Sequence, residues 1–293
     1  MRANINLYPT SAQVRAQMEQ LARDHSDRAS FFDYGPFVGL TFGNPEERAV
    51  ILEFNTHGRE RATSQLGLHL AKTLTQNPPP EVLAALKNTF VMVIPIHNPT
   101  GYDQALKEPL WRKTYDPANP SQCPLTLTDW LGPSAGTDPN RNYPTPAAFP
   151  PLTDVGSTDP CVSEYRGPAS LSEPITKAMY HLAQEHSQNA GIYLTVHGTQ
   201  HYVAYPPNSP SGAEEMVKEI AKRLPGITSG RMSRAIGGTS FAAMAGLGYK
   251  AAILELPEIG KTGSAPSLDQ VKELYEHGGA KEALMVPILL AAK

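Results

Sequence analysis

Two periods of apolar residues alternate along the chain. Short apolar, β-branched runs predict buried strands, and they cover 38–42, 49–54, 89–96, 192–196 and 251–256. Segments with apolar residues every three or four positions predict helices, at 10–24, 61–76, from Pro80, from Ser172, at 211–224 and at 280–292. Strands that alternate with helices favour an α/β fold with a mixed, mostly parallel twisted sheet flanked by helices. Such folds carry their sites at the carboxyl ends of the strands.

The segment from Asn98 to about Pro168 breaks this pattern. It shows little periodicity and is rich in Pro, Gly, Asp and Asn. A stretch this long without regular structure inside a compact domain indicates a functional surface. We find no internal repeat and no linker, so we expect a single catalytic domain over residues 1–293.

Composition excludes several classes of protein. The 293 residues are 40% hydrophobic and carry a formal net charge of −3, without a run of Lys or Arg. We therefore expect no nucleic-acid partner and no membrane partner, and a monomer. The first seven residues contain no apolar core of a signal peptide, which predicts a cytoplasmic protein. Secretion stays open if the natural N-terminus has been trimmed.

A histidine and a glutamate follow the strand at 49–54. His57 and Glu60 are spaced so that an imidazole nitrogen and a carboxylate can face one point. Catalytic zinc takes three protein ligands and leaves a fourth position to water, so this pair would supply two of the three. A loop histidine beside a helix-starting glutamate is often only a solvated cap. The rest of the chain has to decide between the two interpretations.

Several further motifs carry a family resemblance. They are His57-Gly58-Arg59-Glu60, Asn98-Pro99-Thr100-Gly101-Tyr102, Trp111-Arg112-Lys113, Asp138-Pro139-Asn140-Arg141-Asn142, Tyr165-Arg166-Gly167 with Ser172-Glu173-Pro174, Val196-His197 with Tyr205-Pro206, Gly237-Gly238-Thr239, and Glu255. In this order the chain resembles the zinc metallocarboxypeptidases typified by pancreatic carboxypeptidase A. The resemblance spans most of the chain and implies one Zn²⁺ ion as cofactor and a peptide or protein C-terminus as substrate.

The resemblance implies that His57, Glu60 and His197 are the metal ligands. His197 ends a predicted strand just as His57 follows one, so neighbouring strand ends could bring the three groups together. Bound zinc would lower the pKa of a water molecule and polarise a peptide carbonyl. Competing histidines are His69, His97, His181 and His201. We interpret His201 as a core or rim residue.

The resemblance also assigns the residues of the reaction. Glu255 lies in an otherwise apolar strand, and a charge there is costly to bury without purpose, so we expect it to be the general base. A glutamate paired with a structural arginine is the alternative interpretation, and Glu258 is the fallback base. Arg112 would stabilise the oxyanion.

Three residues would bind the substrate by the same resemblance. Asn140 and Arg141 would hold its terminal carboxylate, which a planar guanidinium matches well, and Arg59 would serve a further subsite.

The chain departs from the family at the side-chain pocket and at its flap. The family carries a mobile tyrosine about twenty residues before the general base, but no tyrosine lies between Tyr205 and Tyr249. Arg231 or Arg234 could replace it. Thr199 stands where the family has an aromatic residue. Ser240 falls at the expected base of the pocket, with walls from Ala204, Met232 and Ile253, which predicts a neutral, apolar or aromatic C-terminal residue. The two arginines keep an acidic preference open.

The two cysteines, Cys123 and Cys161, exclude a disulfide framework and leave one bridge open. Cys161 matches a half-cystine of the secreted members, and a bridge to Cys123 would imply an oxidising compartment. Two reduced thiols are the alternative. We expect no inhibitory propeptide in this sequence.

The predicted function is that of a zinc-dependent carboxypeptidase that removes the C-terminal residue of a peptide. Two alternatives remain. One is an amidase or peptidase that acts on a specialised peptide, such as a cell-wall peptide or a biosynthetic precursor. The other is an inactive module that binds C-termini, which conflicts with the presence of His57, Glu60, His197 and Glu255.

Overall fold

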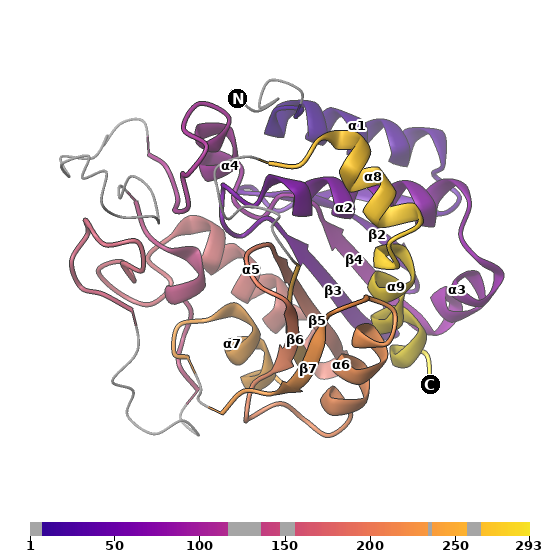
Figure 1. Cartoon of the computed structure of the whole chain (residues 1–293). Coiled ribbons are helices and arrows are strands. Elements are labelled where there is room, and N and C mark those ends of the chain that lie inside the picture. Colours follow the sequence, from indigo (N-terminus) through magenta and orange to yellow (C-terminus); the bar gives the residue numbers. More distant parts are fainter. Residues whose placement is uncertain (1–7, 117–135, 147–155, 234–235, 257–264) are drawn as a thin grey trace.

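A central sheet organises the protein. The structure is a computed structural model that describes residues 8–116, 136–146, 156–233, 236–256 and 265–293. Over these residues the sheet has eight strands in the order β1-β2-β4-β3-β5-β8-β6-β7 (Figure 1). The strands are β1 Ala29–Asp33, β2 Val38–Gly43, β3 Arg48–Phe54, β4 Thr89–Ile94, β5 Ala190–His197, β6 Tyr202–Tyr205, β7 Thr228–Arg231 and β8 Lys250–Glu255.

The middle of the sheet is parallel. Strands β4, β3, β5 and β8 pair in parallel, whereas β1 and β2 on one side and β6 on the other join antiparallel. The outer strand β7 is parallel to β6. The predicted mixed sheet is therefore confirmed, with its parallel strands gathered at the centre.

Helices cover both faces of the sheet. They are α1 Ser11–Asp24, α2 Arg61–Gln76, α3 Pro80–Ala85, α4 Pro99–Ala105, α5 Pro174–Glu185, α6 Ala213–Ala221, α7 Ser240–Gly246, α8 Leu268–Glu276 and α9 Ala280–Ala291. Figure 1 shows α2, α8 and α9 on one side of the sheet and α5 and α7 on the other. Two apolar cores result, one on each face.

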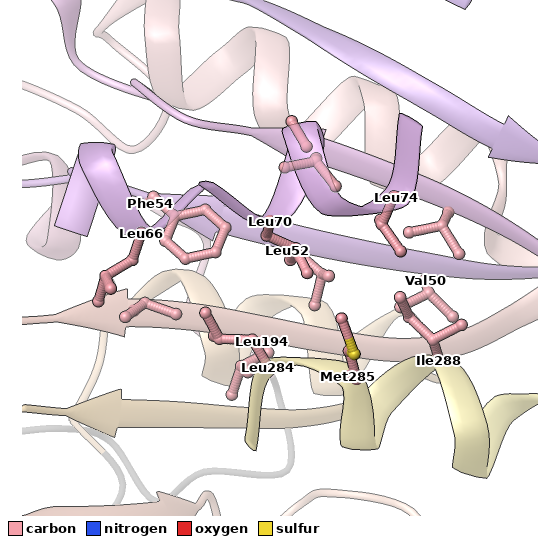
Figure 2. Close-up of a cluster of buried hydrophobic side chains, with 14 of the residues drawn as sticks. Val50, Leu52, Phe54, Leu66, Leu70, Leu74, Leu194, Leu284, Met285 and Ile288 are labelled. Atoms are coloured by element: carbon pink, nitrogen blue, oxygen red, sulfur yellow. The ribbon is translucent and has the colours of Figure 1, made fainter. Parts of the chain in front are cut away.

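Strand β3 contributes to both cores. Val50, Leu52 and Phe54 face the core formed with α2 and α9, as Figure 2 shows, whereas Ala49 and Ile51 face the opposite core. A strand buried on both faces has to be apolar at nearly every position. This burial explains the continuous apolar run in the sequence.

Most predicted elements are present. Helix α1 begins at the predicted capping box, in which Thr10 and Gln13 exchange hydrogen bonds. The predicted strands at 38–42 and 49–54 are β2 and β3, but β4 lies between them in the sheet, so they do not pair.

Strands β1, β6 and β7 and helices α7 and α8 were not predicted. Strand β7 has four exposed residues, Thr228–Arg231, and therefore no apolar pattern to detect. Helix α4 lies in the segment predicted to lack regular structure; Asn98 caps it by accepting a hydrogen bond from the Gly101 amide at 3.0 Å.

The helices offer no candidate for a membrane span. Among the described residues, no helix combines the length and the apolar character needed to cross a bilayer.

Replacing Leu52 by alanine tests the importance of the core beneath β3. Leu52 is fully buried, and the cavity left behind should lower the free energy of unfolding by about 2–5 kcal/mol. The matched control is Leu83→Ala on α3, where 48% of the residue is exposed and we expect a change below about 0.5 kcal/mol. Urea unfolding followed by circular dichroism measures both. Equal losses in the two variants would contradict this picture of the core.

Candidate functional site

Strand register brings the predicted metal ligands to one edge of the sheet. In the parallel pair of β3 and β5, Phe54 lies beside Val196, so His57, just beyond β3, meets His197 at the end of β5. In the next pair, His197 lies beside Glu255 on β8. The carboxyl ends of parallel strands thus place His57, His197 and Glu255 around one point.

Three side chains converge with their ligand atoms in close contact. The Nδ1 atom of His57 lies 2.9 Å from Oε1 of Glu60, and Nδ1 of His197 lies 3.2 Å from Oε2. The two Nδ1 atoms are 3.2 Å apart. All three residues are buried, and Oε2 of Glu60 has no hydrogen-bond partner. Burial would raise the pKa of Glu60, but His57 and His197 hold it well below the usual value.

The other ring nitrogen of each histidine faces a second polar group. Nε2 of His57 lies 3.2 Å from Oδ1 of Asp138, and Nε2 of His197 lies 3.0 Å from Oγ1 of Thr195. These contacts orient both rings so that Nδ1 points to the shared centre. Outer partners of this kind fix the tautomer and orientation of ligand histidines.

This arrangement fits a zinc ion. A tetrahedral shell with zinc–ligand bonds of about 2.0–2.1 Å separates neighbouring ligand atoms by about 3.3 Å, close to the 3.2 Å between the histidine nitrogens. Two imidazoles and one carboxylate are also the donor set of catalytic zinc sites. Zinc would satisfy the Glu60 oxygen that has no hydrogen-bond partner.

Asp138 connects the metal centre with Arg112. Its Oδ2 accepts hydrogen bonds from Nε and Nη2 of Arg112 at 3.1 and 2.8 Å, while Oδ1 faces His57. Burial would raise the pKa of Asp138, but Arg112 and His57 hold it well below the usual value. The ionised carboxylate therefore positions both a ligand and the predicted oxyanion residue.

The loop that carries His57 is packed against two other segments. The Gly58 amide donates to the Arg112 carbonyl at 2.9 Å, and the Asn98 side chain donates to the carbonyls of Thr56 and Lys113. A Cβ atom on Gly58 would lie 2.2 Å from the carbonyl oxygen of Gly101. The glycine in the His57–Glu60 motif is therefore a packing requirement.

Glu255 lines the same cavity as His57 and Glu60. Its Oε2 accepts hydrogen bonds from the amide and the hydroxyl of Thr199, at 3.1 and 3.3 Å. Thr199 thereby orients this carboxylate. Glu258, the fallback base, lies outside the described residues.

The cavity has a volume of about 190 Å³ and a charged and an apolar part. Arg59, Arg112 and Arg141 line it together with Asn140, and Glu164 adds a carboxylate that acts on Arg59 and Arg112. The apolar lining residues are Met232, Ile236, Phe241 and Ile253.

The pocket wall differs from the sequence prediction. Ser240 is fully buried and is not among the lining residues; the next residue, Phe241, lines the cavity instead. The Ser240 amide donates to Oδ1 of Asn140 at 3.0 Å, which links the start of α7 to the Asn140 segment. Ala204 likewise lies in the core and not on the cavity wall.

The segment with Asn140 and Arg141 is attached to the loop before α7. The Tyr143 amide donates to the Gly238 carbonyl at 3.0 Å. Gly238 has a φ of +74°, and a Cβ there would lie 2.2 Å from the Arg141 carbonyl oxygen. Only glycine allows this close approach at low cost, which explains the glycine at position 238.

The competing histidines lie away from the centre. His69 stacks on Tyr275, His97 pairs with Glu53 in the core, and His181 and His201 are exposed. Arg231 is exposed and donates to the Pro207 carbonyl. Arg234 lies outside the described residues.

Cys161 is disulfide-bonded, so the alternative of two reduced thiols is wrong. Cys123, the other cysteine of the sequence, lies outside the described residues. Nζ of Lys113 donates to the carbonyls of Pro160 and Val162 on either side of Cys161. These two hydrogen bonds hold the segment around Cys161 next to Lys113, the neighbour of Arg112 in the sequence.

The sequence is similar to those of known zinc carboxypeptidases. The family model described as "Zinc carboxypeptidase" matches residues 14–250. Mouse carboxypeptidase A1 is 26% identical over 233 residues, which cover 75% of this chain and 52% of that protein. A zinc carboxypeptidase of Simulium vittatum is 28% identical over 210 residues, covering 68% of this chain and 63% of that protein. The chain thus spans about half to two thirds of the length of these relatives.

Solved structures show the same fold. Carboxypeptidase A from Helicoverpa armigera superposes with a TM-score of 0.78 at 18% identity, covering 98% of this chain and 74% of that one. Bovine thrombin-activatable fibrinolysis inhibitor, solved in complex with a tick carboxypeptidase inhibitor, gives 0.75 at 18% identity, covering 99% and 98%.

The variant Asp138→Asn tests the outer contact of His57. Asp138 is fully buried and faces His57, and loss of an outer partner of this kind weakens metal binding about 10- to 100-fold. Competition with a chromogenic chelator measures the zinc affinity. The control is Asp33→Asn, at the end of β1, where the exposed Asp33 carboxylate pairs with Arg15 and contacts no residue of the site. Unchanged zinc affinity in a folded Asp138→Asn protein would show that the contact does not orient the ligand.

Proposed function

The chain belongs to the zinc carboxypeptidase family, and on this premise we propose that it is a zinc-dependent carboxypeptidase that hydrolyses the C-terminal peptide bond of a peptide. One observation carries the proposal. A buried group of His57, Glu60 and His197 lies at one cavity, and His57 and Glu60 line this cavity together with Glu255 and the Asn140–Arg141 pair. A carboxypeptidase needs its hydrolytic groups and its carboxylate-binding groups close enough to contact the same C-terminal residue of the substrate.

The metal centre and Glu255 perform the hydrolysis in this proposal. His57, Glu60 and His197 would hold the zinc ion, which would lower the pKa of a water molecule and polarise the scissile carbonyl. Glu255 takes a proton from the attacking water and passes it to the leaving amine. Thr199 keeps the carboxylate oriented through two hydrogen bonds.

Arg112 supplies positive charge for the oxyanion. Both of its donors to Asp138 come from one edge of the guanidinium, which fixes the plane of the group at the cavity. A donor already fixed in place stabilises developing charge without reorganisation.

Asn140 and Arg141 receive the terminal carboxylate, and Arg59 serves a subsite further along the peptide. The close packing of the Asn140 segment on the loop before α7 supports this role, because it places both residues beside the pocket wall. A guanidinium binds a carboxylate with two parallel hydrogen bonds.

The pocket accepts a neutral, apolar side chain in this proposal. Met232, Ile236, Phe241 and Ile253 supply apolar surface to a cavity whose other lining residues include charged side chains such as Arg141 and Glu164. Burying a charged side chain against this surface would cost free energy without a compensating partner.

The disulfide at Cys161 bears on the compartment. Disulfides persist in oxidising environments and are rare in the cytosol. On this ground we propose an oxidising compartment, in contrast to the cytoplasmic location expected from the first seven residues.

A peptide panel tests the function. Peptides that differ only in the C-terminal residue should release free amino acid, fastest for apolar and aromatic residues, and a chelator should abolish the release. Amidated peptides should resist cleavage, because Arg141 then meets no carboxylate. Equal cleavage of amidated peptides would favour the amidase alternative. A protein that binds peptides but cleaves none would be a binding module.

The variant Glu255→Gln tests the general base. Removing the proton acceptor should lower kcat about 10²- to 10⁴-fold, while zinc content stays at one ion per chain. The control is Glu214→Gln on α6, whose exposed carboxylate pairs with Lys218. Full activity of Glu255→Gln would require another base.

A further inference from the structure

Tyr202 stands directly opposite the proposed general base. In the antiparallel pair of β6 and β8, Tyr202 is the register partner of Glu255. Directly opposed residues project from the same face of a sheet with their Cβ atoms about 4.5–5.5 Å apart. Tyr202 accordingly lines the cavity together with Glu255, Arg141 and Phe241.

The hydroxyl of Tyr202 has no hydrogen-bond partner in the described part of the chain. The buried tyrosines Tyr8, Tyr102 and Tyr249 donate to the backbone carbonyls of Pro266, Pro9 and Ala183, whereas Tyr202 is partly buried. A largely buried phenol usually finds such a partner. The hydroxyl of Tyr202 can therefore donate a hydrogen bond to a molecule that enters the cavity.

The charges around Tyr202 keep it protonated. Burial, reinforced by Glu255, raises the pKa of Tyr202 above its usual value, although Arg141 acts in the opposite direction. The phenol is therefore a hydrogen-bond donor at neutral pH. An anionic group beside Arg141 could accept hydrogen bonds from both the Tyr202 hydroxyl and the Arg141 guanidinium.

The substrate carboxylate is a better acceptor than Glu255. Glu255 already accepts two hydrogen bonds from Thr199, and a further donor would make it a weaker base. Arg141 uses Nη1 to donate to the Asn140 carbonyl at 2.8 Å, so it keeps donors on its other nitrogens. A second neutral donor would complete the binding of a carboxylate there.

We propose that Tyr202 donates a hydrogen bond to the terminal carboxylate of the substrate, beside Arg141. The inference rests on the proposed carboxypeptidase function. It assigns the carboxylate contact to a strand of the sheet, whereas the position of the family's mobile tyrosine holds no tyrosine in this chain. Tyr202 is accordingly a binding residue with a fixed position.

The variant Tyr202→Phe removes only the hydroxyl. A hydrogen bond to a charged group is worth enough to raise KM about 10- to 100-fold, and kcat should stay within about threefold. The free amino acid released by the reaction should inhibit the variant more weakly by the same factor. Inhibition by the corresponding amino acid amide should not change.

Tyr205→Phe is the matched control. Tyr205 lies on the same strand but packs against the core on the other face of the sheet, so its variant should keep the KM of the unchanged protein. Thermal unfolding and zinc content verify that both variants are folded and loaded.

The outcomes separate this inference from the proposed function. If the unchanged protein releases no amino acid, the carboxypeptidase function fails. If it is active and Tyr202→Phe keeps its KM and its inhibition by the amino acid, only the Tyr202 assignment fails. A loss of kcat at unchanged KM would also overturn the assignment, because Tyr202 would then act on Glu255.

Discussion

The parallel register of β3, β5 and β8 is the constraint on which the site depends. It places Phe54 beside Val196 and His197 beside Glu255. A shift by one residue would turn His197 and Glu255 to the opposite face of the sheet. The apolar side chains of β3 resist such a shift, because Val50 and Leu52 are fully buried in one core and Ile51 in the other. The cores thus hold the catalytic geometry in place.

Burial of charge at the sheet edge needs compensation. Glu60 and Asp138 are almost completely buried, and an isolated buried carboxylate is strongly unfavourable. Glu60 faces two histidines, and Asp138 faces His57 and Arg112. A metal ion at the centre would add positive charge beside Oε2 of Glu60, the oxygen without a hydrogen-bond partner. The polar groups of the site therefore stabilise one another, and removing one leaves its neighbour unpaired.

Asparagine side chains hold the long segment between β4 and β5 against the sheet. Asn98 links the loop after β3 with the Arg112 segment. Asn142 donates to the carbonyls of Arg166 and Ala169 and accepts from Thr176 at 2.6 Å. A segment without its own sheet hydrogen bonds satisfies its backbone through such side chains. These hydrogen bonds position Arg112, Asp138 and Asn140 at the site, although the segment that carries them shows little apolar periodicity.

The sequence by itself determined the elements with strong local patterns and the residues within short motifs. The spacing of apolar residues predicted β3, β5, α1 and α2, because burial of one or both faces of an element requires apolar residues at regular positions in its sequence. The ligand group of His57, Glu60 and His197 followed from motif order, and the structure brings these residues together. Only the tertiary structure decided that Phe241 and not Ser240 lines the pocket, and that Tyr202 faces Glu255. These relations join residues from different elements, and they depend on strand register and loop packing. No local pattern encodes them, since short or exposed strands such as β6 and β7 carry too few buried positions to show a period.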